Sequence, residues 1–275
     1  MDHTPDCANR NYESLYEAFE SPLMREVRRE AYGEDIGQHS WVTAADLRRD
    51  AVRLNIPIGG RLLDLGCGPC GPLTFVVTSQ TCYGIGLDVS AAALAAGLLR
   101  AQSLGVEARV TLQETDLNGP IPLENNDVDA AMSLDVVLHF RDRLRAFKEV
   151  ARVLKPGARL LFTDAGVVTG SISNEEVAAR SMHGFMQFCI PGFNEMMLER
   201  AGFVLLATEN RTAALIENAM GRSAARLKYQ AELEQFEGFL GFGRYQEYLK
   251  SVISMSQRGV LSRVMYLAGN GATAG

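Results

Sequence analysis

Short apolar runs alternate with amphipathic segments through most of the chain. The apolar runs predict seven strands, over residues 61–65, 83–87, 108–113, 128–133, 159–163, 204–208 and 261–268. A helical period of apolar positions fills the segments 90–103 and 142–154. Because strands that alternate with helices are typical of βαβ units, we expect an α/β fold with a doubly wound, mostly parallel, seven-stranded sheet.

Boundary signals support both of these helices. Ser90 precedes an alanine-rich segment and is a suitable N-cap. Lys155-Pro156-Gly157 follows the segment 142–154, where proline cannot extend a helix and glycine tolerates a left-handed turn. We therefore expect the second helix to stop there and a strand to follow immediately.

Helical flanks lie on both sides of this core. Residues 12–20 and 43–54 carry helical periodicity and are joined by a loop rich in polar and aromatic groups. Residues 213–257 predict two further helices, separated at Gly241-Phe242-Gly243. The expected organisation is an N-terminal helical cap or lid (1–55), a core (56–210) with a substrate-side segment (170–195), a helical lid insertion (211–257), the last strand (258–268) and a disordered tail (269–275).

The composition is that of a compact enzyme. Of 275 residues, 47% are hydrophobic, which provides a sizeable core. The formal charge of −6 argues against a nucleic-acid partner, and the longest apolar stretches are too short to span a membrane. Five scattered cysteines and the lack of a signal-like opening segment make a reducing cytoplasm the expected compartment.

A glycine-rich turn follows the first strand and carries the strongest chemical signal. Gly66, Gly68 and Gly71 have the G-x-G-x-x-G spacing of a dinucleotide site, so an NAD-dependent oxidoreductase is the first candidate. Asp88 ends the next apolar run, 22 positions after Gly66, where one carboxylate can engage both hydroxyls of a ribose. The pattern therefore predicts a nucleotide-like ligand.

The charge of this turn argues against a pyrophosphate. Asp64 lies two positions before the first glycine, and the turn contains no basic residue. A buried carboxylate would repel a phosphate, whereas it would attract an ammonium or sulfonium group. The turn therefore favours a ligand with an amino-acid head group.

Five segments in sequence order resemble the motif set of the class I S-adenosyl-L-methionine (SAM)-dependent methyltransferases. They cover residues 63–69, 86–90, 116–117, 129–139 and 154–160. The segments 32–36 and 134–143, with the helical flank before the last strand, are similar to the small-molecule group that includes sarcosine/dimethylglycine methyltransferases and related natural-product methyltransferases. The resemblance covers about half the chain. It implies a Rossmann-like fold, SAM as cofactor, S-adenosyl-L-homocysteine as product, and a small, soluble acceptor methylated at N, O or C.

The resemblance also implies a set of cofactor-binding residues: Tyr32, Asp64, Gly66, Cys67, Gly68, Asp88, Val89, Asp116, Leu117, Leu134, Asp135 and His139. Asp64 would lie near the methionine portion, and Asp88 would accept hydrogen bonds from both ribose hydroxyls. Asp116 would take the exocyclic amine of the adenine. Leu134 and Asp135 would line the methionine end and the reaction centre.

Two histidines are candidates for a catalytic base. In-line displacement mainly requires donor and acceptor to be positioned, but a hydroxyl acceptor would benefit from a base. His139 lies one turn beyond Asp135 and would share its side of a helix that begins there. It also fits a helix-start histidine bonded to the backbone. His183 stands among Met and Phe residues that line either a pocket or the core.

Three segments outside the core are expected to select the substrate. They are the loop 32–41 with Tyr32, His39 and Trp41 as a lid, the segment 173–193, and the insertion 213–257. The aromatic and methionine residues of the last two, Phe185, Met186, Phe188, Phe193, Phe236 and Phe239, suggest an acceptor with an apolar part.

Position 70 departs from the family pattern, which usually has glycine there. If this position requires a positive φ, Cys70 is strained. Cys67 and Cys70 have no second Cys/His pair nearby, so no metal site is expected. A non-catalytic SAM-binding protein stays open as an alternative to an enzyme, and the sequence leaves open both the acceptor and whether the chain forms a homo-oligomer.

Overall fold

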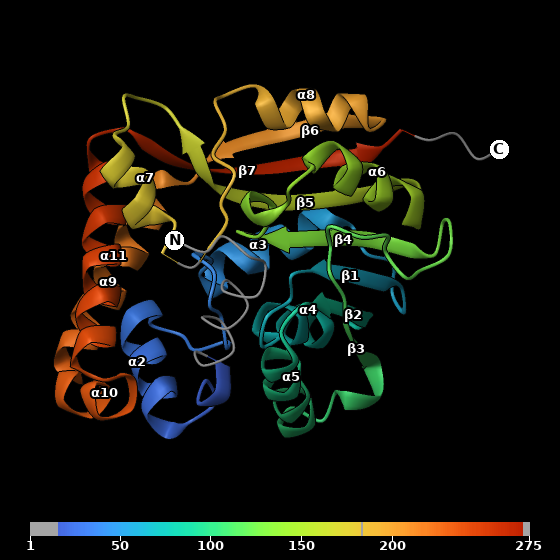
Figure 1. Ribbon diagram of the computed structural model, residues 1–275. Coiled ribbons are helices and arrows are strands. Elements are labelled where there is room, and N and C mark those ends of the chain that lie inside the picture. The colour runs from blue at the N-terminus through green and yellow to red at the C-terminus, as the bar shows by residue number, and fades with distance from the viewer. Residues whose placement is uncertain (1–15, 183, 272–275) are drawn as a thin grey trace.

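The computed structural model describes residues 16–182 and 184–271, which fold around a seven-stranded sheet (Figure 1). The strands are β1 (Arg61–Leu65), β2 (Tyr83–Asp88), β3 (Val110–Glu114), β4 (Val128–Leu134), β5 (Leu154–Val168), β6 (Phe203–Asn210) and β7 (Leu261–Asn270). Their order is β3-β2-β1-β4-β5-β7-β6. The strands from β3 to β5 pair in parallel, and β7 runs antiparallel to β5 and β6. This confirms the predicted doubly wound, mostly parallel α/β sheet.

Helices cover both faces of the sheet. On one face lie α3 (Ala44–Leu54), α4 (Gly71–Gln80) and α5 (Ala91–Ser103), and on the other lie α6 (Arg143–Val153) and α8 (Phe193–Arg200). Short 3-10 turns, η1 (Glu107–Arg109) and η2 (Val137–His139), precede β3 and follow β4. Leu62 of β1 packs in the first layer and Leu63 in the second. Since both faces are covered, the strands are apolar at successive positions rather than alternately polar.

The boundaries of α5 and α6 follow the sequence signals in part. Ser90 caps α5 as predicted, because its hydroxyl accepts a hydrogen bond from Ala93 N at 3.1 Å. The α6 helix ends at Val153, but β5 begins at Leu154, so Lys155-Pro156-Gly157 lies inside the strand rather than before it. Leu154 pairs with Val128 and Arg159 with Ala130. The intervening residues form a bulge that accommodates the proline and the positive φ of Gly157.

The insertion before β7 contains three helices where two were predicted. These are α9 (Thr212–Lys228), α10 (Gln230–Glu237) and α11 (Phe239–Gln257). The second break falls at Gly238, whose φ of 75° and ψ of 154° are accessible almost only to glycine. Gly241-Phe242-Gly243 lies within α11 instead, with Phe242 buried. The last strand is also longer than expected, because β7 continues to Asn270, which pairs with Phe203.

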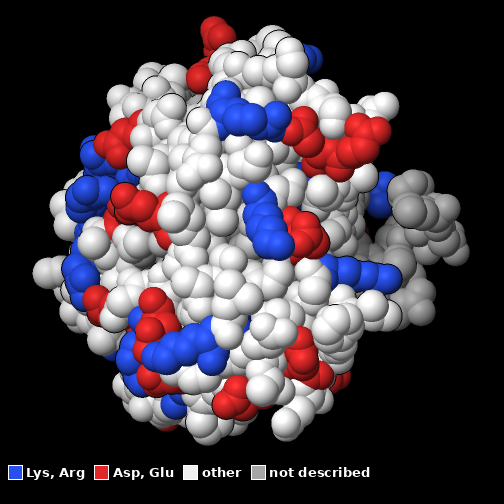
Figure 2. Space-filling model, turned by 90° about the vertical axis from the view of Figure 1, so that its left-hand side faces the viewer, with Lys and Arg blue, Asp and Glu red and all other residues white. Residues whose placement is uncertain are grey.

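The two helical flanks meet beside the sheet, at the left of Figure 1. There α2 (Pro22–Tyr32) packs on α9, and α11 packs on α9 and on α7 (Asn174–Arg180). Met24 and Val27 of α2 share a core cluster with Ala225 of α9. On the outer side of this helical layer, basic and acidic side chains are scattered among uncharged ones (Figure 2). Within the described ranges, each helix is too short or too polar to cross a membrane.

Candidate active site

A cavity of about 490 Å³ lies at the carboxyl ends of the parallel strands, beneath the N-terminal loop and the helical layer. The structure brings together there most of the expected cofactor residues: Asp64, Gly66, Cys67, Gly68, Asp88, Val89, Asp116, Leu117, Leu134, Asp135 and His139. Tyr32 does not line the cavity. Its hydroxyl donates to the carbonyl of Ser40, which does, and burial raises the pKa of Tyr32 to about 12. Tyr32 therefore contacts a loop residue that lines the cavity, and does not line the cavity itself.

The glycine turn after β1 brings bare backbone to the cavity wall. Gly66 and Gly68 have φ values of 74° and 52°. A Cβ on Gly66 would lie 2.4 Å from the Val136 side chain, so no larger residue fits. A Cβ on Gly71 would lie 2.1 Å from the carbonyl oxygen of Gly37. The N-terminal loop therefore rests directly on this turn.

Cys70 adopts the left-handed conformation, with φ 58° and ψ 19°. The strain expected of a non-glycine residue at this position is thus present. Its fully buried thiol packs against α5, where a Cβ on Gly97 would lie 2.5 Å from Cys70 Sγ. Cys67 Sγ is 3.5 Å from Cys70 Sγ, and the described residues contain no group of three His, Cys, Asp or Glu that could hold a metal.

Asp64 is an acid without a counter-charge. Its side chain lines the cavity and is 2% exposed, yet it makes no hydrogen bond or ion pair within the described part of the chain. Burial, and then the negative charge of Asp88, raise the pKa of Asp64 well above its ordinary value. A cation placed here would reverse both effects, because it would stabilise the ionised carboxylate.

Asp88 is held by backbone amides at the end of β2. Its carboxylate accepts hydrogen bonds from Gly68 N at 2.8 Å and from Ser90 N at 2.9 Å. These two amides fix the orientation of the carboxylate at the cavity wall. Asp116 follows β3 and is exposed; its Oδ1 accepts from Asn118 N at 2.9 Å. The two acids lie at neighbouring strand ends, because β2 and β3 pair in parallel and their carboxyl ends meet at the same edge of the sheet.

Asp135 is the most connected acid of the cavity. It follows β4 with a left-handed φ of 61°. Its carboxylate accepts hydrogen bonds from Arg263, Thr163 and the amide of Trp41. Burial by itself would raise the pKa of Asp135, but the charge and hydrogen bonds of Arg263 lower it below its ordinary value. Asp135 therefore stays ionised and joins the core to the N-terminal loop.

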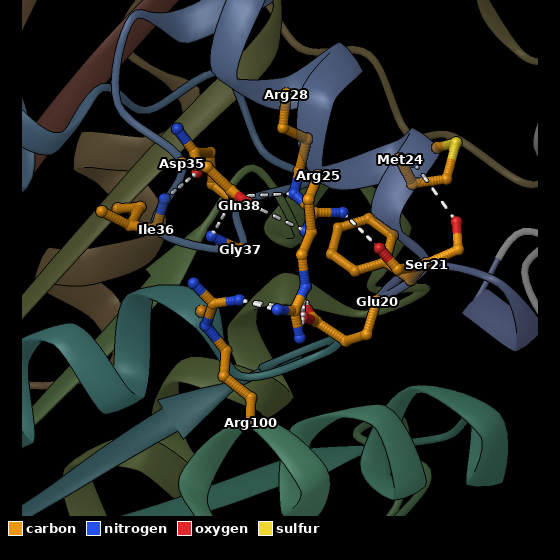
Figure 3. Close-up of polar contacts among 12 residues, drawn as sticks. Glu20, Ser21, Met24, Arg25, Arg28, Asp35, Ile36, Gly37, Gln38 and Arg100 are labelled. Atoms are coloured by element: carbon orange, nitrogen blue, oxygen red, sulfur yellow. Dashed lines mark hydrogen bonds and ion pairs between the residues drawn. The ribbon is translucent and has the colours of Figure 1, made fainter. Parts of the chain in front are cut away.

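The loop over the cavity is held by a buried ion cluster (Figure 3). Arg28 Nε donates to Asp35 Oδ1 at 2.7 Å, and the same oxygen accepts from Gly37 N at 2.8 Å. Glu20 lies between Arg28 and Arg100 of α5, at 3.6 Å and 3.1 Å. The cluster joins α2, the loop 32–41 and α5.

His139 lines the cavity and contacts the backbone. It lies at the end of η2, lines the cavity, and its Nδ1 is 2.8 Å from the carbonyl oxygen of Phe185. Since a carbonyl only accepts, Nδ1 carries a proton and Nε2 is the basic atom of the neutral ring. Burial lowers the pKa of His139. His183, the other candidate, lies outside the described residues.

The helical side of the cavity contains residues that the sequence patterns did not single out. Arg180, Arg222, Tyr245 and Tyr248 come from α7, α9 and α11 and all line it. The sequence indicated only that they lie in the segments expected to select the substrate. Single arginines and tyrosines on amphipathic helices usually face solvent or the core, so no pattern distinguished these four.

Only part of the expected apolar acceptor wall is present. Phe185 and Met186 line the cavity. Phe188 and Phe193 instead pack at the edges of core clusters, and Phe236 and Phe239 are 51% and 73% exposed. The last two were misplaced because the helix break falls at Gly238, which turns the adjoining residues outward.

Comparison with known proteins agrees with this geometry. Residues 63–162 match the family model of the methyltransferase domain. Methyltransferase GfsG of Streptomyces halstedii is 32% identical over 133 residues, 48% of this chain and 46% of that protein. Glycine/sarcosine/dimethylglycine N-methyltransferase of Actinopolyspora halophila is 27% identical over 218 residues, 79% of this chain and 37% of that protein. The chain thus spans less than half the length of either relative.

A solved structure shows the same fold. The cyclopropane synthase MmaA2 from Mycobacterium tuberculosis has a TM-score of 0.79 and 16% sequence identity, over 98% of this chain and all of that one. Residues 63–162 thus match the methyltransferase domain family, and the likeness to the solved structure is one of fold.

Proposed function

We propose that the protein binds SAM and transfers its methyl group to a small, soluble acceptor. The observation that carries this proposal is Asp64, a buried carboxylate that faces the cavity without a counter-charge in the described chain. A dinucleotide would bring a pyrophosphate toward this negative charge, whereas SAM brings an ammonium and a sulfonium group. The residues present therefore fit SAM better than NAD.

The neighbouring residues fit the remaining parts of the same cofactor. Gly66 and Gly68 allow close approach of a ligand to the backbone, and Asp88 would accept hydrogen bonds from the ribose hydroxyls. Asp116 and Leu117 would hold the adenine from the end of β3. Bound SAM supplies an electrophilic methyl group, so the protein's main task is to position the acceptor.

His139 is our candidate for the base that removes the acceptor proton. Its Nδ1 proton is committed to the Phe185 carbonyl, and its lowered pKa keeps the ring neutral near pH 7. Neutral Nε2 suits a hydroxyl or an ammonium acceptor, both of which must lose a proton. The Tyr32–Trp41 loop would exclude water from this reaction.

The class of acceptor and the cellular compartment are proposed from the names of the relatives and from the free cysteines. The names of both curated relatives describe methyltransferases, and one name specifies glycine, sarcosine and dimethylglycine. These names favour a small metabolite as acceptor. Cys67, Cys70, Cys82 and Cys189 are all free thiols, which favours the cytoplasm.

Calorimetry with SAM, S-adenosyl-L-homocysteine and NAD tests the cofactor. We expect binding of the first two and none of NAD; binding of NAD alone would replace the proposal with an oxidoreductase. Incubating methyl-labelled SAM with extracts of small metabolites then tests turnover. Labelled product is expected, and SAM binding with persistent absence of product would favour a non-catalytic SAM-binding protein.

A further inference from the structure

Two buried arginines on the helical side of the cavity lack an acidic partner. Arg180 ends α7 and Arg222 lies on α9, and they are 2% and 8% exposed. Neither forms an ion pair within the described ranges. The nearby buried acids are already engaged, since Asp164 pairs with Arg143 at 2.6 Å and Asp135 pairs with Arg263. Among the described residues, these two positive charges therefore have no acidic counter-charge.

Within the described part of the chain, Arg180 donates hydrogen bonds to neutral groups. Its Nη1 donates to the Tyr248 hydroxyl at 3.0 Å and lies 3.3 Å from Met186 Sδ. Its Nη2 donates to the Ala165 carbonyl at 3.4 Å. Arg180 Nε is buried and has no hydrogen-bond partner among residues 16–182 and 184–271. This guanidinium thus retains a donor that a ligand could use.

Arg222 is likewise surrounded by neutral acceptors. It donates to the His39 carbonyl at 3.2 Å and to the Tyr245 hydroxyl. Its guanidinium lies 4.6 Å from the ring centre of Trp41, which compensates the charge only in part. The Tyr245 and Tyr248 rings are 5.8 Å apart, so the two tyrosines connect Arg222 to Arg180 along one wall.

We propose that this wall binds an oxyanion group, carboxylate or phosphate, on the methyl acceptor. Burying a charge without a counter-ion costs free energy. An anionic ligand that binds here would supply the missing counter-charge and offset part of that cost. Guanidinium groups match the geometry of both oxyanions. That this ligand is the methyl acceptor rests on the proposed function. Phe185 and Met186 are placed to contact an apolar part of the same molecule.

The carboxylate of the cofactor is the competing ligand for this wall. It carries one negative charge, so it can neutralise one of these arginines but leaves the other. The acids that fit the cofactor, Asp64 and Asp88, lie on β1 and β2, whereas both arginines lie on the helical layer. This separation assigns the second positive charge to another ligand.

Three isosteric probes test the charge of the ligand: benzoate, benzamide and benzamidine, which are anionic, neutral and cationic. The protein is first saturated with S-adenosyl-L-homocysteine, and binding is followed by calorimetry and by the fluorescence of Trp41, the one tryptophan of the chain. We expect benzoate to bind about tenfold or more tighter than benzamide, and benzamidine to bind weakest. Phenyl phosphate compared with benzoate identifies the preferred oxyanion.

Variants assign the preference to the two side chains. Arg180→Met and Arg222→Met are each expected to reduce the preference for benzoate over benzamide several-fold, and Arg180→Lys and Arg222→Lys should retain part of it because the charge remains. Arg244→Met is the matched control, since Arg244 is an exposed arginine on α11 that does not line the cavity. Circular dichroism confirms that each variant is folded.

Three results would overturn the proposal. Benzamide could bind as tightly as benzoate, the preference could survive both methionine variants, or it could vanish once S-adenosyl-L-homocysteine is bound. The last result would assign the arginines to the cofactor. If neither SAM nor its product binds at all, the proposed function fails, while the preference measured without them still decides whether the anion site exists.

Discussion

Asp135 and Arg263 form a buried ion pair between residues 128 positions apart in the sequence. Arg263 Nε donates to Asp135 Oδ1 at 2.9 Å, and Nη2 donates to Oδ2 at 3.1 Å. The amide of Trp41 donates to the same carboxylate at 2.9 Å. The Asp135 side chain thus joins the end of β4, the last strand and the loop 32–41 at the cavity.

Replacing Arg263 is expected to destabilise the fold strongly. Arg263→Met leaves the Asp135 carboxylate buried without its counter-ion, which costs about 3–5 kcal/mol of unfolding free energy. Adding Asp135→Asn should recover part of this loss because the amide is uncharged. Urea denaturation of the two single variants and the double variant measures the coupling. Purely additive losses would contradict the pairing.

Asp64→Asn is expected to separate stability from cofactor affinity. The substitution removes a buried charge that lacks a partner, so the ligand-free protein should be as stable as the wild type or more so. SAM affinity should fall about 10- to 100-fold, because a charge-assisted contact is lost. Thermal melts and calorimetry measure the two effects. Unchanged SAM affinity would remove Asp64 from the site.

The pH dependence of SAM binding follows from the same group. Burial raises the pKa of Asp64 in the free protein, and a bound cation lowers it, so binding releases a proton between these two pKa values. SAM affinity should therefore rise with pH across this interval. Calorimetry in buffers with different ionisation enthalpies detects the proton, and Asp64→Asn should abolish the release.

His139→Gln tests the proposed base, since the amide can still donate to the Phe185 carbonyl. Because burial lowers the pKa of His139, the wild-type rate should rise with pH through this lowered pKa and then level off. The variant should lose this rise, and kcat should fall about 10²- to 10⁴-fold for a hydroxyl acceptor. An unchanged rate and profile would exclude the role.

The lid should depend on its buried ion pair and not on its exposed one. Arg28 and Asp35 form the buried contact, whereas Arg48 and Glu34, at 2.8 Å, are both about half exposed. Arg28→Met is expected to raise the dissociation rate of SAM about tenfold. Arg48→Met should change it less than about twofold, because exposed pairs contribute little. Stopped-flow fluorescence of Trp41 compares the dissociation rates of SAM from the two variants. Equal rates would contradict the proposed role of the buried Arg28–Asp35 ion pair.

The cost of Gly97→Ala should be removed by a second substitution, Cys70→Gly. Gly97→Ala alone should cost about 1–3 kcal/mol, because the new Cβ would lie 2.5 Å from Cys70 Sγ. In a Cys70→Gly background the clash is absent, and alanine is favoured over glycine in α5 by about 1 kcal/mol. The double variant should then be at least as stable as Cys70→Gly. Equal effects of Gly97→Ala in both backgrounds would disprove the contact.

The cofactor half of the cavity follows closely from the sequence. Asp64, Gly66 and Gly68 belong to one strand and its turn, and Asp88 ends the next strand. Parallel pairing of β1 with β2 then places these residues together whatever the rest of the chain does. Local pattern and strand order were therefore sufficient to predict both their proximity and their charge.

The acceptor half depended on the tertiary structure. Arg180, Arg222 and Tyr248 lie on three helices, and their amphipathic patterns do not specify which side chain enters a cavity. Whether a buried charge is compensated depends on its neighbours in space, as the pairing of Asp135 with Arg263 and the isolation of Arg180 both illustrate. The sequence by itself determined the sheet, the glycine turn and the acids at the ends of β1 and β2, because those are local; only the packing of the helical layer decided which charges line the rest of the cavity.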